Sequence, residues 1–114
     1  MCIPYRESAT GKWARLFPDF VFIHSVDGEL KPSIVDPHGI QLADWRDKLN
    51  GYLDYADKHS DRFRSINPIT EIDGKVLALA IHNSKTRSDV RAALSANESV
   101  EHVFRQFGVD YMTS

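Results

Sequence analysis

The sequence contains one cysteine, Cys2, among 114 residues. A single cysteine excludes an internal disulfide framework and a zinc site built from cysteines. The sequence also lacks a run of about 18 apolar residues, the length that a membrane-spanning helix requires. Residues 1–20 lack the apolar segment of a secretory signal peptide. We therefore expect a cytoplasmic protein that works in a reducing compartment and has no membrane partner.

The sequence has little surplus charge of either sign, because its formal net charge is -2. A strongly basic nucleic-acid-binding protein would have a large positive net charge. Any affinity of this chain for DNA must therefore come from local basic patches or from a partner. Hydrophobic residues make up 42% of the chain and charged residues 26%, which is ordinary for a globular protein and argues against global disorder. We expect one domain over residues 1–114, with one modest core.

The first third of the chain is expected to form strands. Residues 2–8 resemble a short edge strand, since Pro4 cannot donate a ladder hydrogen bond. Residues 12–25 alternate and then become continuously apolar, which favours one strand running from the edge into the core. Asp27-Gly28 is a hairpin turn signal, and residues 30–36 then form the returning strand.

The pattern changes after residue 40. Apolar residues recur at steps of three and four, which predicts a long amphipathic helix: Leu42, Trp45, Leu49, Tyr52, Leu53 and Ala56. Residues 62–73 follow as an irregular strand, and residues 76–83 are apolar enough for a central strand buried on both faces.

The C-terminal third is expected to be helical, with two short helices over residues 87–96 and 98–108, and a loose tail from residue 109. Together these elements predict an α+β sandwich with a mixed sheet of about five strands. Its order is an antiparallel meander, a long helix, two strands and short C-terminal helices.

Asp19 and Asp36 are the candidate functional acids, because they lie on consecutive strands that should pair and both adjoin apolar runs. Two neighbouring carboxylates repel each other, and a cation between them relieves that repulsion. Oxygen ligands suit magnesium, which can polarise a phosphodiester and activate water. The alternative is that both aspartates only end strands or begin turns, as the Pro-Asp and Asp-Pro dipeptides often do.

Two further side chains are candidates for proton transfer or charge stabilisation. His38 follows the second acid by two residues and would orient or deprotonate water, or it is a loop histidine without a role. Lys48 lies four residues after Asp44 on the predicted helix, where the two would form a solvated ion pair. If the helix packs across the hairpin, Lys48 would instead supply positive charge for phosphoryl chemistry.

Basic residues gather after the long helix at Lys58, Arg62 and Arg64, where they would contact phosphates. Further basic residues lie around Arg15 and around Arg87. Ordinary surface charge balanced by acids is the alternative explanation for all of these groups.

These motifs resemble the PD-(D/E)xK nuclease superfamily: a Pro-Asp on one strand, a hairpin, a second acid two residues before a base, and then a helix. More closely, four segments are similar to the C-terminal nuclease-like region of type III restriction enzyme-type helicases: "LFPDFVFI", "SIVDPHG", "LADWRDKLNGYLDYADKHSDRF" and "EIDGKVLALAI". The resemblance covers roughly residues 5–95. It implies a restriction-endonuclease-like fold in which Asp19 and Asp36 hold Mg²⁺ or Mn²⁺.

The sequence departs from that superfamily pattern in two places. His38 stands where the superfamily has a lysine, and Lys48 is the candidate replacement. The superfamily core usually begins with a helix, whereas this chain begins almost in the first strand. The helicase phosphate loop is also missing from the sequence. We therefore expect a helicase or translocase partner, or a homodimer.

Three hypotheses about function follow from the sequence. The first is a metal-dependent DNA endonuclease domain from a restriction or defence system, with Asp19, Asp36, His38 and Lys48 as its catalytic residues. The second is a catalytically degenerate nuclease-fold module that serves as an interaction or dimerisation domain. The third is a protein of a mobile element without a role on DNA.

Overall fold

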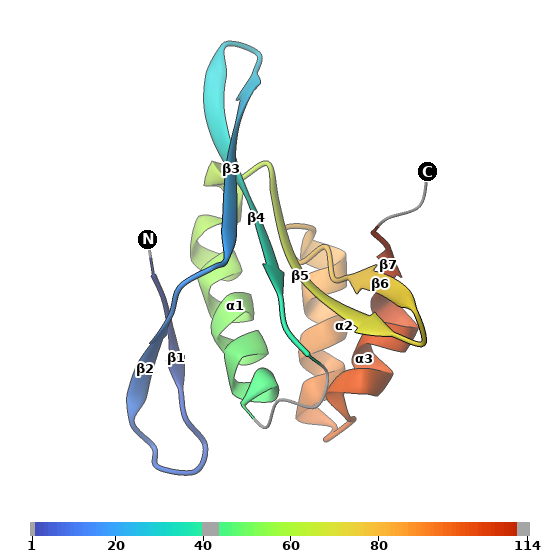
Figure 1. Cartoon of the computed structure of the whole chain (residues 1–114). Helices are drawn as coiled ribbons and strands as arrows, with labels where there is room; N and C mark the ends of the chain where they lie inside the picture. Colours follow the sequence, from blue (N-terminus) through green and yellow to red (C-terminus); the bar gives the residue numbers. More distant parts are fainter. Residues whose placement is uncertain (1, 40–43, 112–114) are drawn as a thin grey trace.

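The structure, a computed structural model that describes residues 2–39 and 44–111, contains two separate β-sheets. Figure 1 shows the helices gathered on one side of the larger sheet. The strands are β1 Ile3–Arg6, β2 Trp13–Leu16, β3 Phe20–Val26, β4 Glu29–Pro37, β5 Ser65–Ile72, β6 Lys75–Ala78 and β7 Val109–Asp110. The helices are α1 Trp45–His59, the 3-10 helix η1 Ser60–Arg62, α2 Ser84–Ser95 and α3 Val100–Phe107.

The larger sheet has the strand order β3-β4-β5-β6-β7. Only the β4–β5 pair is parallel among the described strands, and α1 makes the crossover that joins them. The other neighbours are antiparallel. The predicted α+β class, with a five-stranded mixed sheet, is therefore confirmed.

The main core lies between this sheet and the helices. Ile34, Ile66 and Ile72 contribute from the strands, and apolar stripes of the three helices pack against them. The largest fully buried helical side chains are Trp45, Tyr52, Phe104, Leu49, Leu53, Val90 and Val103. Among the described residues, no helix is long and apolar enough to cross a membrane.

The small β1–β2 sheet packs against α1 at Gly51. A Cβ atom on Gly51 would lie 2.6 Å from Tyr5 Cβ and 2.8 Å from the Pro4 carbonyl oxygen. Ser8 also donates from its backbone N–H and its hydroxyl to the Asp47 carboxylate of α1. Glycine is thus required in α1 for the approach of β1, although it weakens a helix locally.

Three sequence predictions about the strands were wrong. Residues 12–25 form two strands in different sheets, because Pro18 lies in the break between β2 and β3. The apolar run at 76–83 leaves the ladder after Ala78, and its buried Leu79 and Ile81 donate irregularly to β5 carbonyls. The tail was expected to be loose, yet Val109–Asp110 pairs with β6 as β7.

We predict that Gly51→Ala destabilises the fold by about 1–3 kcal/mol, because the new methyl group overlaps β1. Alanine is the better helix former, so helix propensity alone predicts a gain in stability. Chemical denaturation measures the difference, with Asn50→Ala at the exposed neighbouring position as the control. Equal stability of the two variants would show that β1 does not lie against Gly51.

Candidate functional site

The carboxylate of Asp36 is the centre of the candidate site. Asp36 lies on β4 with its side chain on the helix-facing side of the sheet, and the residue is fully buried. Its Oδ2 accepts the Tyr52 hydroxyl of α1 at 2.5 Å, and its Oδ1 accepts the backbone N–H of Asp19 at 3.2 Å. One buried carboxylate therefore joins β4, α1 and the start of β3.

His38 is the third partner of this carboxylate. Its Nε2 lies 3.0 Å from Asp36 Oδ2, and an ionised carboxylate has only acceptors, so Nε2 carries the proton. The imidazole also packs on Trp45, with 4.7 Å between the ring centroids. The backbone of His38 bonds to β5 in both directions, through the Ile69 carbonyl and the Thr70 hydroxyl. The histidine is therefore held in place from several sides.

The hydrogen bonds decide the charge of the Asp36–His38–Tyr52 cluster. Burial by itself raises the pKa of Asp36, but the bonds from His38 and Tyr52 outweigh it and leave that pKa below its ordinary value. Burial and the adjacent carboxylate raise the pKa of the Tyr52 hydroxyl. At neutral pH the cluster thus contains an ionised Asp36 and a protonated Tyr52.

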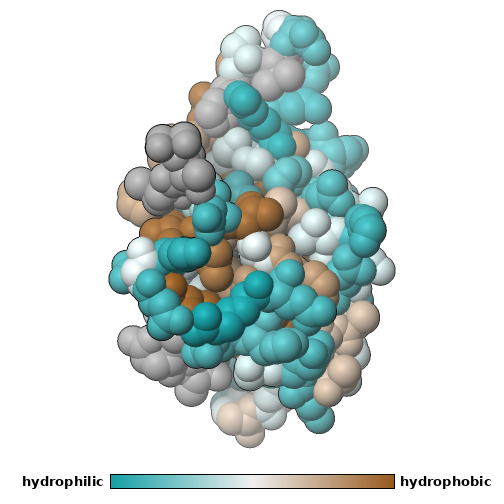
Figure 2. Space-filling view, turned by 90° about the vertical axis from the view of Figure 1, so that its right-hand side faces the viewer, coloured by the Kyte–Doolittle hydropathy of each residue, from teal (hydrophilic) through white to brown (hydrophobic). Residues whose placement is uncertain are grey.

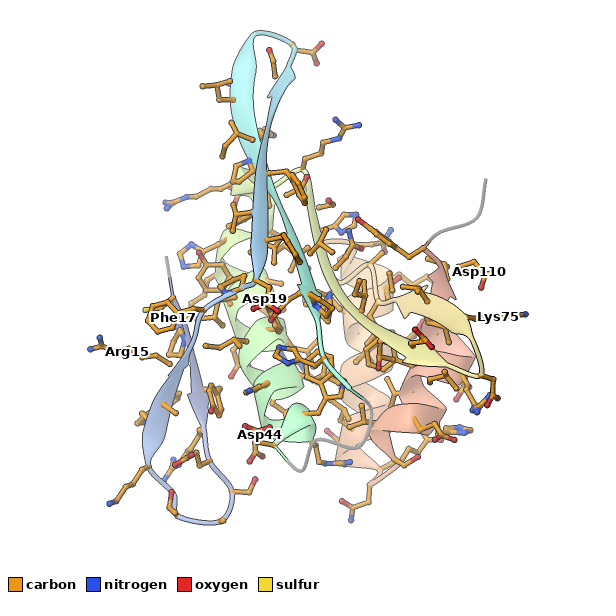
Figure 3. The ribbon with its side chains drawn as sticks, viewed as in Figure 1. Arg15, Phe17, Asp19, Asp44, Lys75 and Asp110 are labelled. Atoms are coloured by element: carbon orange, nitrogen blue, oxygen red, sulfur yellow. The ribbon has the colours of Figure 1, made fainter. Side chains whose placement is uncertain are left out.

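Asp19 was expected beside Asp36 in a buried position, and the structure brings the two residues together through a backbone contact. Asp19 itself is exposed and lies just before the start of β3, where Figure 3 labels it. The neighbouring apolar run was expected to be inside as well, and this was wrong. Phe20 is 51% exposed, Val21 40%, Phe22 49% and Ile23 62%.

Lys48 lies on the same side of α1 as Trp45 and Tyr52, three and four residues away. Its side chain is only 17% exposed, and its ammonium pairs with Asp44 at 3.3 Å. The predicted Asp44–Lys48 ion pair is therefore confirmed, and Figure 3 shows Asp44 at the start of α1. The described contacts do not join Lys48 to Asp36 or to Asp19.

The predicted nucleic-acid-binding residues Lys58, Arg62 and Arg64 lie exposed at the C-terminal end of α1 and just beyond it. The basic residues of α2 behave differently. Arg87 pairs with Asp57, and Arg91 pairs with both Asp54 and Asp57 of α1. These arginines join two helices, so they are engaged within the fold.

A shallow hollow of about 430 Å³ lies at the end of β4, lined by β4, β5 and β6. Val35, Ile69 and Ala78 form a small apolar cluster on this face of the sheet, away from the helices. Figure 2 views the molecule from the side of β6 and β7 and shows apolar surface gathered there, with hydrophilic residues around it. The hollow has an apolar floor and a polar rim that includes Glu71.

A family model matches the chain over residues 1–112. The chain belongs to the YagJ family. It is similar to Protein YagJ of Escherichia coli (strain K12), with 38% identity over 102 residues. These residues make up 90% of this chain and 40% of that protein, so the chain spans well under half of the relative's length. No solved structure matches this YagJ-family chain.

Sequence reasoning missed Tyr52 as a partner of Asp36 and assigned it only to the apolar face of the helix. A tyrosine on a buried face needs a hydrogen-bond partner for its hydroxyl. This requirement was the signal in the sequence that Tyr52 bonds to a buried polar group. The partner is 16 residues away in the chain, and only the packing of α1 on β4 brings the two together.

Asp36, one of the two magnesium ligands that the nuclease resemblance implies, is already engaged within the fold. Magnesium requires near-octahedral oxygen ligands at about 2.0–2.1 Å and usually retains several waters. Both Asp36 oxygens already accept hydrogen bonds, and the residue is closed to solvent. Within residues 2–39 and 44–111, no group of three or more His, Cys, Asp or Glu could hold a metal ion.

We predict that Tyr52→Phe lowers the free energy of unfolding by about 1.5–3 kcal/mol, because Asp36 loses a hydrogen bond to a buried charge. Chemical denaturation of both proteins measures the change. Tyr55→Phe, on the same helix and only partly buried, is the matched control and should stay within about 0.5 kcal/mol of wild type. Equal losses in the two variants would contradict the role of the Tyr52–Asp36 bond.

A second prediction concerns acid stability. The folded-state pKa of Asp36 is lowered, so its contribution to stability is present above the unfolded value of about 3.9 and is lost as pH falls through the folded pKa. Asp36→Asn should therefore be less stable than wild type at neutral pH, and the difference should shrink on acidification. Thermal unfolding from pH 7 downward tests this, and parallel curves would contradict it.

Proposed function

We propose that this chain is a protein-interaction module that binds an extended polypeptide strand along the free edge of β3. The observation that carries the proposal is the exposure of four consecutive apolar residues, Phe20–Ile23, on a strand at the edge of the sheet. Among the described residues, β3 pairs with β4 alone. Figure 1 shows the β3–β4 hairpin extending beyond the helices that cover the rest of the sheet.

An unprotected edge strand is a liability in a soluble protein, because its free N–H and C=O groups can pair with another chain. Proteins usually protect such edges with lysine, proline, a bulge or a covering segment. The sequence of β3, FVFIHSV, contains no lysine, arginine, acid or proline. An edge strand of this composition can form backbone hydrogen bonds with another chain. The addition of such a strand is an established mode of peptide recognition.

The hairpin turn determines which backbone groups are free. Asp27 and Gly28 both have positive φ, as a two-residue type I′ turn requires. In such a hairpin Val26 and Glu29 form a hydrogen-bonded pair, and the pattern alternates along the strand. The N–H and C=O groups of Val21, Ile23 and Ser25 therefore point away from β4 and are available to a partner.

The Asp36 cluster supports this assignment over a metal-dependent nuclease. Its carboxylate is ionised, buried and bonded to groups of the fold itself, so its evident contribution is to hold β3, β4 and α1 together. The second of the three sequence hypotheses, the interaction module, is thus the one that the geometry favours.

We predict that a peptide carrying residues 20–26 binds the β3 edge. Added in excess over ¹⁵N-labelled protein, it should shift the amide signals of Val21, Ile23 and Ser25 more than those elsewhere in the sheet. The matched control is the same peptide with proline in place of its central isoleucine, since proline cannot donate to a ladder. Shifts elsewhere, or equal shifts with both peptides, would contradict the proposed binding edge.

The nuclease hypothesis makes a competing prediction for the same chain. If it holds, plasmid DNA is cleaved with Mg²⁺ or Mn²⁺ and Asp19→Asn abolishes the cleavage. Asp19 is exposed, so this change should leave the fold intact. The proposed interaction module predicts no difference between wild type and the variant, and a metal-dependent activity lost in Asp19→Asn would overturn it.

A further inference from the structure

We propose that the occupant of the β3 edge is a second copy of this chain, paired antiparallel to form a two-fold symmetric dimer with one continuous ten-stranded sheet. This inference rests on the proposed function, because it names the partner of the same edge. A strand that pairs with its own copy about a two-fold axis needs only one surface, and that surface must be complementary to itself.

The charge pattern of β3 meets this requirement. Antiparallel self-pairing about a two-fold axis places the central residue opposite its own copy and keeps only its near neighbours close to theirs, so a lysine or an acid near the middle of the strand would face a like charge. The segment Phe20–Val26 has neither. Asp19 and Asp27 flank this segment. In a pairing centred on Ile23 they lie opposite each other's copies at the two ends of the ladder, where both side chains are exposed and solvent screens their charges.

The free backbone groups determine a register. Pairing all seven residues of β3 places Ile23 opposite Ile23 of the second copy, and Val21 opposite Ser25 of that copy. These are the three residues whose N–H and C=O groups point away from β4. In this register the free groups of one copy lie opposite the free groups of the other along the whole strand. The pairing then forms about six backbone hydrogen bonds.

The apolar side chains of β3 occupy both faces of the strand, and Ile23 lies at the axis. Phe20 and Phe22 stack on one face of the strand, with 6.2 Å between their ring centroids. Val21 and Ile23 occupy the other face, because side chains alternate along a strand. In this register Ile23 meets Ile23 of the second copy on one face, and on the other face Phe20 and Phe22 lie opposite positions 26 and 24 of that copy.

The exposed apolar side chains of β3 supply part of the interface that a stable dimer needs. A phenylalanine offers about 150–250 Å², so the half-exposed rings of Phe20 and Phe22 contribute about 100 Å² each. With Val21 and Ile23, the apolar side chains of two copies expose roughly 700 Å² in total, and a specific interface buries about 1,000 Å².

Analytical ultracentrifugation over a range of micromolar concentrations tests the dimer with the full chain. Wild type should sediment as a dimer, and Ile23→Lys should raise its dissociation constant at least about tenfold, because two ammonium groups would meet at the axis. Ile23 is 62% exposed, so the change should not unfold the domain. Trp13→Lys, at an apolar residue of β2 that is 65% exposed, is the matched control and should remain dimeric.

A charge exchange tests the register. Ile23→Glu alone should also be monomeric, whereas an equimolar mixture of Ile23→Lys and Ile23→Glu should restore a dimer containing one copy of each. A monomeric wild type, or a dimer unaffected by Ile23→Lys, would overturn the inference, and so would a mixture that stays monomeric. If wild type is monomeric but the peptide of residues 20–26 still shifts the β3 edge, the interaction function stands and only the second copy fails as partner.

Discussion

The buried carboxylate of Asp36 is the constraint on which the arrangement of this domain depends. A charge closed to solvent is stable only when its oxygens are fully bonded, and here the donors come from Tyr52, His38 and the Asp19 backbone. Because these donors belong to α1, the end of β4 and the start of β3, the bonds fix the crossover helix and the hairpin relative to each other. The hairpin can then extend past the helices from a rigid base.

That extension separates the strand into two functional parts. Just before β3 begins, the backbone N–H of Asp19 bonds to the buried Asp36 carboxylate and ties the strand to the core. Beyond that point its apolar side chains are exposed on both faces of the sheet, and its outer backbone groups face solvent. An uncharged and unprotected edge of this kind can pair with another strand, which is the basis of the proposed interaction.

The sequence predicted the features that local chemistry determines and missed those that depend on distant contacts. Asp27-Gly28 signalled the hairpin because its turn requires positive φ, and the apolar period of α1 signalled the helix. The exposure of Phe20–Ile23 was missed, because an apolar strand has the same pattern whether the core or a partner covers it. Tyr52 was missed as a partner of Asp36 because only tertiary packing brings them together, and the buried turn at Leu79–Ile81 was mistaken for strand because it is equally apolar.

Amide hydrogen exchange of β3 as a function of protein concentration tests the central claim most directly. If the edge of β3 pairs with a second copy, the amides of Val21, Ile23 and Ser25 exchange slowly at high concentration and become fast on dilution and in Ile23→Lys. The amides of Phe20 and Phe22, which bond within the hairpin, should change much less. Fast exchange of the three edge amides at every concentration would contradict the account.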